Sequence, residues 1–286
     1  MRRLGRNRLL TLLMVTPSIV IVGVFLLVPL LIVVAYSFAE RDSYGGVVPA
    51  FTFNNYTQLL DPIYHPIMWG SLELAAINTL LALAIGYPIA YFIAFRAGRW
   101  APLLLVLILV PFWINFLIRI SAWIVLLGRG GLINATLQAF GIIDEPVRML
   151  GTYGAVQVGL LYAFLPSAVL PIYAALQPIN RTLLEAAHDL GANPLQSFLR
   201  VTLPLSLSGV MAAVLFVFVP SMGVFAIPVL LGGGKEIIIG NLIVQLFLEF
   251  RNIPLGAAVS VILLLASSLG ILLYMRALRK IELARS

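Results

Sequence analysis

The chain has 286 residues, of which 62% are hydrophobic and 10% are charged, and its formal net charge is +7. Ordinary soluble domains carry roughly 25% charged residues, so this composition excludes a soluble domain and predicts an integral membrane protein. The absence of cysteine excludes disulfides, a thiolate nucleophile and a cysteine-based zinc site. The two histidines, His65 and His188, are far apart in the sequence and have no partners at metal-ligand spacing, so we expect no metal site.

Six apolar stretches are long enough to cross a bilayer as helices, because a hydrocarbon core of about 30 Å needs about 20 apolar residues. We therefore predict an all-α, six-helix polytopic membrane protein. The first stretch follows four arginines but is far longer than a signal-peptide core, so we expect it to be retained as the first helix. The six stretches are residues 9–38, 69–95, 101–127, 153–176, 205–231 and 255–277.

Basic residues are distributed unevenly over the segments that flank these stretches. The N-terminus, the loops after the second and fourth stretches, and the C-terminus together hold twelve basic and three acidic residues. The other loops hold five basic and seven acidic residues. The positive-inside rule then predicts a multi-pass membrane protein with both termini in the cytoplasm. The positive net charge is thus a topology signal, and we expect no nucleic-acid partner.

Prolines interrupt most of the predicted spans. A proline frees a backbone carbonyl, which a neighbouring helix or cavity water must satisfy. Such interruptions are typical of helices that bend in transport proteins, although proline is also generally commoner in membrane helices. The interrupting residues are Pro29, Pro88, Pro111, Pro166, Pro171, Pro220 and Pro228.

The predicted cytoplasmic loop at residues 177–204 is polar and too long for a simple turn. Apolar residues at helical spacing predict a helix that ends before Gly191, where a left-handed conformation is favoured. Asn193 is placed to cap a second helix that begins at Pro194. The apolar stripe on these helices must pack against the protein's own bundle or fill a groove on another protein.

The same loop resembles the EAA loop of ATP-binding-cassette (ABC) importer permeases. The resemblance rests on Glu185-Ala186-Ala187, on Gly191 at its fixed spacing and on Leu203-Pro204, with Val201 standing where the family usually has Ile. It implies that the loop is a cytoplasmic coupling helix, which docks into a groove of the ATPase subunit. The implied coupling residues are Glu185, Ala186, Ala187, Asp189, Gly191, Asn193, Pro194, Leu203 and Pro204.

Four further segments, at residues 54–64, 111–120, 222–225 and 240–258, extend the resemblance to the spermidine/putrescine (polyamine) uptake permeases. This family implies one permease domain over residues 1–286, of the type I ABC importer kind, that moves its substrate by alternating access. It also implies three partners: an ABC ATPase dimer, a second homologous permease subunit and an extracytoplasmic substrate-binding protein. The chain lacks a nucleotide-binding motif, so we expect it to bind no cofactor and to be no enzyme, with ATP and Mg held by the partner ATPase.

Besides Arg276, which lies at the end of the sixth stretch and is counted with the C-terminus, two charged residues lie within the predicted spans. Arg119 either forms a gating ion pair, for which Glu73 is a candidate partner, or extends to the interface. Glu73 itself either lines a pathway or faces lipid headgroups. Aromatic residues such as Trp113 and Tyr162 either offer cation–π faces or anchor the interface.

Asn241, Gln245 and Glu249 are spaced four residues apart and so share one face of a helix. This segment resembles the family's short outer or re-entrant helix, and a plain packing face is the alternative. The full set of candidate pathway or gate residues is Glu73, Trp113, Asn115, Arg119, Tyr162, Met222, Phe225, Asn241, Gln245 and Glu249.

Two other functions remain open at this level. One is a permease for another solute, such as sulfate, molybdate or an iron complex. The other is a stand-alone channel or secondary carrier, for which residues 177–204 would be an intracellular loop without a partner.

Overall fold

The computed structural model describes residues 15–17, 20–42, 44–234 and 237–283, with side chains as far as residue 279. The first residues of the first predicted span, 9–14, lie outside this part of the chain. Within the described ranges, six helical segments are long and apolar enough to cross a membrane, as predicted for an all-α polytopic protein. These segments are Val15–Ser37, His65–Phe95, Phe116–Ala139, Tyr153–Leu176, Pro194–Gly223 and Ile253–Arg279.

The chain separates into two compact units. The first consists of residues 1–64 and 242–265, and the second consists of residues 65–241 and 266–286. Elements of the first unit are η1 (Gly23–Leu27), α2 (Val28–Ser37), β1 (Glu40–Arg41), β2 (Val47–Val48), α3 (Asn54–Gln58) and η4 (Gln245–Glu249). Two helices cross the boundary between the units, α13 (Ile239–Val244) and α14 (Ile253–Leu283).

The second unit holds most of the helices. In chain order they are α4 (His65–Phe95), η2 (Gly98–Trp100), α5 (Ala101–Trp113), α6 (Phe116–Leu127), α7 (Leu132–Ala139), α8 (Tyr153–Leu176), α9 (Arg181–Asp189), α10 (Pro194–Ser197), η3 (Phe198–Thr202), α11 (Leu203–Gly223) and α12 (Ala226–Gly232).

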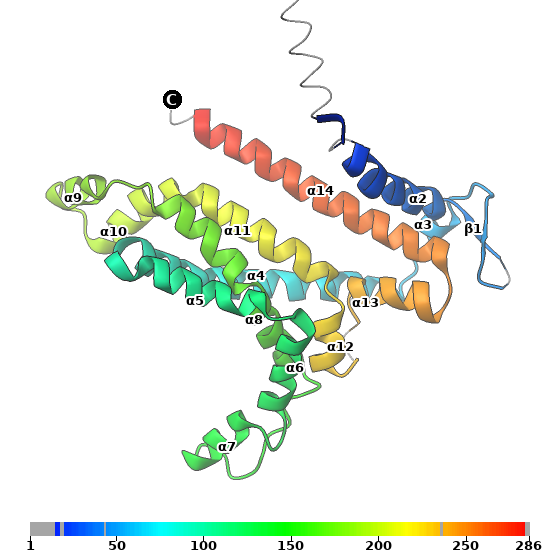
Figure 1. Ribbon diagram of the computed structural model, residues 1–286, viewed down its shortest axis with the longest axis horizontal. Helices are drawn as coiled ribbons and strands as arrows, with labels where there is room; N and C mark the ends of the chain where they lie inside the picture. The colour runs from blue at the N-terminus through cyan, green and yellow to red at the C-terminus, as the bar shows by residue number, and fades with distance from the viewer. Residues whose placement is uncertain (1–14, 18–19, 43, 235–236, 284–286) are drawn as a thin grey trace, which may run out of the picture. The chain divides into compact units, whose positions relative to one another are not determined.

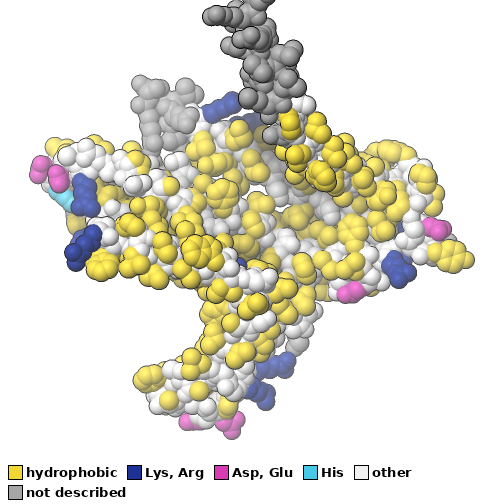
Figure 2. Space-filling model, in the orientation of Figure 1, with side chains coloured by type: hydrophobic (Ala, Val, Ile, Leu, Met, Phe, Trp, Pro, Cys, Tyr) yellow, Lys and Arg dark blue, Asp and Glu magenta, His cyan; other side chains and the backbone are white. Residues whose placement is uncertain are grey.

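The centre of the second unit is a packed group of three helices, in which α8 contacts both α4 and α11 (Figure 1). Small residues allow this close approach: a side chain at Gly209 of α11 would collide with the Pro171 carbonyl and with Ala175 of α8. Val169, Ile172 and other apolar residues are fully buried where the helices meet. Figure 2 shows apolar side chains over the visible face of the long helices, as expected for helices that face lipid.

The predicted third span is broken in the structure, which corrects the expectation of one continuous helix over residues 101–127. Ile114 is extended, with φ −82° and ψ 139°, and separates α5 from α6. Pro111 has no N–H, so the last turn of α5 lacks one backbone hydrogen bond. After the break, the Asn115 side chain accepts a bond from Leu117 N at 2.9 Å and so starts a new helix. By length and hydropathy the candidate crossing in this region is Phe116–Ala139, which is itself interrupted at residues 128–131 between α6 and α7.

The predicted fifth span is also interrupted. Val224 is extended, with φ −71° and ψ 128°, so that α11 ends at Gly223 and α12 begins at Ala226. Pro220 lies four residues before this break, as Pro111 lies three before the other. In both places a proline close to the helix end removes a stabilising hydrogen bond.

The first unit contains a short antiparallel hairpin, in which Glu40 pairs with Val48 and Arg41 with Val47. The Asn55 side chain, which is buried, donates to the carbonyls of Ser37 and Ala39 at 2.9 and 2.8 Å. These bonds fix α3 against the end of α2.

Candidate functional site

The segment between α8 and α11 folds as a helix, a glycine corner and a second helix. The Asn180 side chain accepts from Thr182 N at 3.1 Å and caps α9. At the other end, Gly191 has φ +81° and its N–H bonds to His188 O at 2.9 Å, while Ala192 N bonds to Ala187 O at 3.0 Å. This pair of bonds is the Schellman motif, which requires a left-handed residue at the position of Gly191.

The second helix begins with a reciprocal cap. Asn193 accepts from Gln196 N at 2.8 Å, and the Gln196 side chain accepts from Asn193 N at 3.0 Å, with Pro194 at the first helical position. The helical path continues through η3 directly into α11 at Leu203 and Pro204. A force on this segment therefore acts directly on a membrane-spanning helix.

Much of this segment is exposed. Leu190 and Leu195 are 90% and 65% exposed, and Glu185, Ala186 and Asp189 are exposed as well. A hollow of about 260 Å³ lies at the corner, lined partly by Ala187 and Gly191. Figure 2 shows charged side chains gathered around α9. An exposed apolar and charged surface of this kind is suited to docking against another protein.

Four contacts attach the segment and the first turn of α11 to the last turns of α4. The Phe198 ring lies 5.4 Å from the Tyr87 ring, edge to face, and 6.4 Å from the Tyr91 ring. The Tyr87 hydroxyl is 2.7 Å from Ser206 Oγ. Arg181 Nη2 donates to Phe95 O at 2.7 Å. The segment is thereby attached to α4 as well as continuous with α11.

Two of the candidate pathway residues, Arg119 and Tyr162, lie together. Arg119 is 8% exposed, and its Nη1 donates to Pro111 O at 3.1 Å. Its guanidinium carbon lies 4.9 Å from the centroid of the Phe112 ring and 5.9 Å from that of Tyr162. Cation–π contacts of this kind stabilise a desolvated guanidinium. Arg119 Nε has no hydrogen-bond partner.

Glu73 is exposed on α4, and no ion pair joins it to Arg119 within the described residues. Trp113, at the end of α5, is 80% exposed. Asn115 is the cap of α6 described above, which gives its side chain a structural role.

Among the other candidates, Asn241 contacts Phe225. The Asn241 side chain is buried and donates to Phe225 O at 3.3 Å, while its Oδ1 has no partner. Met222 is 7% exposed. Gln245 and Glu249 lie in the first unit, in the π-helical turn η4. Because hydrogen bonds of a π-turn span five residues, α-helical spacing does not hold through this turn.

Sequence reasoning did not identify the buried pair Asn78 and Ser221, whose side chains are 2.8 Å apart and join α4 to α11. Gln157 on α8 was also missed, and its Nε2 donates to Leu74 O at 3.3 Å. Both Asn78 Oδ1 and Gln157 Oε1 are buried without a partner. A polar residue within an apolar span was the available signal, because such residues usually face the bundle interior.

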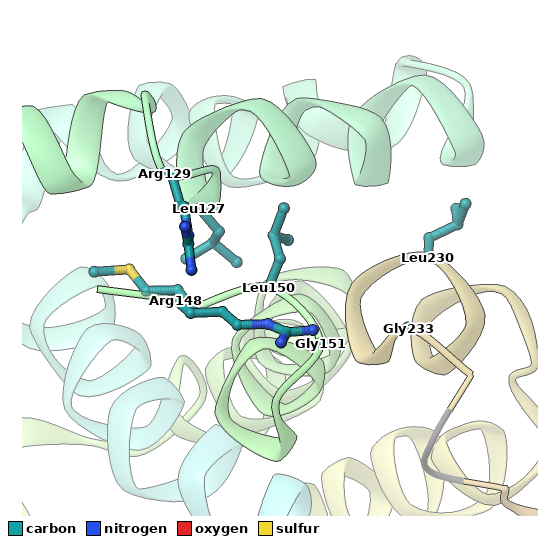
Figure 3. A pocket seen from close by; sticks show the side chains of 8 residues that line it. Leu127, Arg129, Arg148, Leu150, Gly151, Leu230 and Gly233 are labelled. Carbon is teal, nitrogen blue, oxygen red and sulfur yellow. The ribbon is translucent and has the colours of Figure 1, made fainter. Parts of the chain in front are cut away.

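A cavity of about 430 Å³ lies between the loop after α6, the loop before α8 and the end of α12 (Figure 3). Arg129 and Arg148 line it together with apolar residues that include Leu127, Leu150 and Leu230. Two guanidinium groups repel cations, so this cavity does not suit a positively charged solute.

Solved structures of ABC transporters contain chains with the same fold. A chain from a bacterial ABC transporter involved in the import of the acidic polysaccharide alginate matches with a TM-score of 0.78 and 18% identity, covering 98% of both chains. The same TM-score is found for the alginate transporter in complex with an alginate pentasaccharide-bound periplasmic protein. The fold is therefore that of an ABC transporter permease.

Several relatives are more similar to this chain in sequence than these solved structures are. The spermidine/putrescine transport system permease protein PotB of Escherichia coli is 43% identical over 263 residues, which cover 91% of this chain and 96% of the relative. PotB of Haemophilus influenzae is 44% identical over 263 residues, covering 91% of this chain and 92% of the relative. No family model matches the sequence. The chain belongs to the spermidine/putrescine transport system permease family, and it is a multi-pass membrane protein.

Proposed function

We propose that this chain is the permease subunit through which an ATP-driven importer moves polyamines, spermidine or putrescine, across the bacterial cytoplasmic membrane. The observation that carries this proposal is the identity of 43% to PotB over nearly the full length of both chains. One permease domain over residues 1–286 would contribute half of the pathway, and a second homologous permease would contribute the other half.

The exposed segment from α9 to η3 is the proposed docking surface for an ABC ATPase dimer, which would bind ATP and Mg. Its contacts with Tyr87 and Phe95 and its continuity with α11 support this role. Closure of the ATPase dimer would displace the segment and tilt α4 and α11, which changes access to the pathway. Both termini and this segment would then lie in the cytoplasm, and a substrate-binding protein would dock on the opposite side.

The candidate pathway residues have a more limited role in the proposal. Arg119, held under aromatic rings and bonded to Pro111 O, is suited to hold the α5–α6 break and not to bind a polycation directly. Glu73, Met222, Phe225, Asn241, Gln245 and Glu249 remain proposed pathway or gate residues, with Trp113, Asn115 and Tyr162.

Co-purification tests the proposed class. A tagged chain extracted in mild detergent should bring down an ATPase and a second permease in stable stoichiometry. A chain that purifies alone and conducts solute in vesicles without ATP would instead be a channel or a secondary carrier.

Competition between solutes tests the proposed substrate. Uptake of labelled spermidine by cells that express the complex should be suppressed by excess putrescine and unaffected by sulfate or molybdate. Suppression by an oxyanion and indifference to polyamines would contradict the polyamine assignment.

A further inference from the structure

An apolar groove lies between the last turns of α4 and the first turns of α5. Its volume is about 470 Å³, which is in the range of roughly 300–1,000 Å³ found for ligand sites. Phe92 and Leu107, one from each helix, are 53% and 56% exposed, so the groove is open. The seven side chains that line it are all apolar: Pro88, Ile89, Phe92, Ile93, Leu104, Leu107 and Ile108.

The turn that joins α4 to α5 follows the last groove residue of α4 and precedes the first of α5, so it lies beyond one end of the groove. It carries two arginines that are not themselves part of the groove lining. Arg96 N donates to Phe92 O at 2.8 Å, so the helical geometry continues to Arg96 and places it on the same side as Phe92. A long side chain on a helix leans toward the helix N-terminus, which directs Arg96 toward the groove.

Arg99 belongs to the same turn. Its guanidinium carbon lies 5.3 Å from the centroid of the Trp100 ring, and Trp100 is 55% exposed. An exposed tryptophan beside a basic residue at the end of a membrane helix is typical of the headgroup region. No carboxylate pairs with Arg96 or Arg99 within the part of the chain that the structure describes.

An apolar groove with two unpaired guanidinium groups at one end is complementary to an amphiphile with an anionic head and a hydrocarbon tail. We propose that it binds an anionic phospholipid, with the phosphate at Arg96 and Arg99 and one acyl chain along the groove between α4 and α5. Guanidinium groups suit phosphate because their donors match its oxygen atoms. A helix of the second permease would fill the apolar part equally well, but an apolar helix would leave both arginines unpaired.

The site is next to the contacts that hold the proposed docking segment (α9 to η3) against α4. Phe95 accepts the bond from Arg181, and Phe95 lies one residue before Arg96. A bound lipid would therefore stiffen the end of α4 that the proposed docking segment contacts. This consequence for ATP hydrolysis rests on the proposed function, whereas the binding of lipid does not.

Lipid retention by the purified complex tests the proposal. Native mass spectrometry should detect bound phosphatidylglycerol after mild detergent extraction, and Arg96→Gln with Arg99→Gln should weaken its binding about 25-fold, since each basic residue near anionic lipid contributes about fivefold. Arg276→Gln, which removes an exposed charge from α14 outside the groove, should leave binding unchanged. Equal retention by the double variant and the wild type would overturn the proposal.

Cross-linking identifies the occupant directly. The chain has no cysteine, so Leu107→Cys can be labelled with a benzophenone at a single position. In vesicles of phosphatidylcholine and phosphatidylglycerol, photolysis should attach phosphatidylglycerol to α5, and the attachment should fall in the double variant. Cross-links to the second permease in place of lipid would show that the groove is a subunit interface.

Discussion

Gly191 is the residue at which local conformation matters most for the proposed coupling role. Its φ of +81° completes the end of α9 and turns the chain toward α10, and no heavy atom lies within 4 Å of where a Cβ would stand. The constraint at this position is therefore one of backbone conformation and not of space. The left-handed conformation costs an L-residue roughly 1–2 kcal/mol, and it costs Asn less.

We expect Gly191→Val to abolish substrate-stimulated ATP hydrolysis, because a β-branched residue resists the left-handed conformation and misplaces the corner. Gly191→Asn should retain most of the stimulation, since Asn tolerates that conformation. Both variants should assemble with their partners, because the site is exposed. Equal stimulation in the Val variant and the wild type would place the coupling corner elsewhere.

Residue-level prediction from the sequence was accurate where the signal is local. The cap at Asn193 and the turn at Gly191 follow from neighbouring residues, which interact whatever the rest of the fold does. The pairing of Asn78 with Ser221 joins residues 143 positions apart, and nothing in one sequence specifies which distant span a buried polar residue will meet.

At the scale of helices, the breaks near Pro111 and Pro220 are features that hydropathy alone did not predict within the third and fifth spans. Apolar residues continue through both breaks, so a window that averages hydropathy sees one long span. The position of each break depends on backbone hydrogen bonds and, at the first, on the cap by Asn115. These details divide the predicted spans without altering their number.

The contact between α4 and the proposed docking segment (α9 to η3) gives a prediction at this scale. Tyr87→Ala removes both the ring packed on Phe198 and the bond to Ser206, and should reduce stimulated ATP hydrolysis while basal hydrolysis persists. Tyr87→Phe keeps the ring and should have a smaller effect, because aromatic pairs contribute about 0.5–1.5 kcal/mol. Stimulation measured on the assembled complex should fall in the order wild type, Phe, Ala. No difference between Ala and wild type would remove α4 from the coupling path.

The packing of α11 on α8 gives a second prediction at the scale of helices. Gly209→Ala places a Cβ against the Pro171 carbonyl, which cannot yield without moving the backbone. We expect this variant to lower the thermal unfolding midpoint in detergent, with a cost of about 1–3 kcal/mol for overpacking. Gly154→Ala is the matched control, because its Cβ would meet only Thr152 Oγ1 at 3.9 Å. An unchanged midpoint for Gly209→Ala would show that the two helices separate more easily than their packing implies.

For the whole molecule, the apolar composition predicted a membrane protein, and a single loop predicted the importer family. Both rest on signals that extend over many residues, namely apolar length and fixed motif spacing. The substrate pathway was not predictable in the same way. In the proposed importer, its second wall would belong to another chain. The candidates in this chain are divided between Arg119 with Tyr162, Phe225 with Asn241, and residues of the first unit.

The central claim is that this chain carries polyamine across the membrane at the expense of ATP hydrolysed by a partner. The most direct measurement is the initial rate of radiolabelled spermidine uptake by proteoliposomes that contain the purified complex and its binding protein, with ATP supplied on the side of the ATPase. We predict uptake that requires ATP and is lost in Gly191→Val. Uptake that proceeds equally without ATP would contradict the claim. So would an assembled complex that takes up no spermidine but whose ATPase activity is stimulated by another solute.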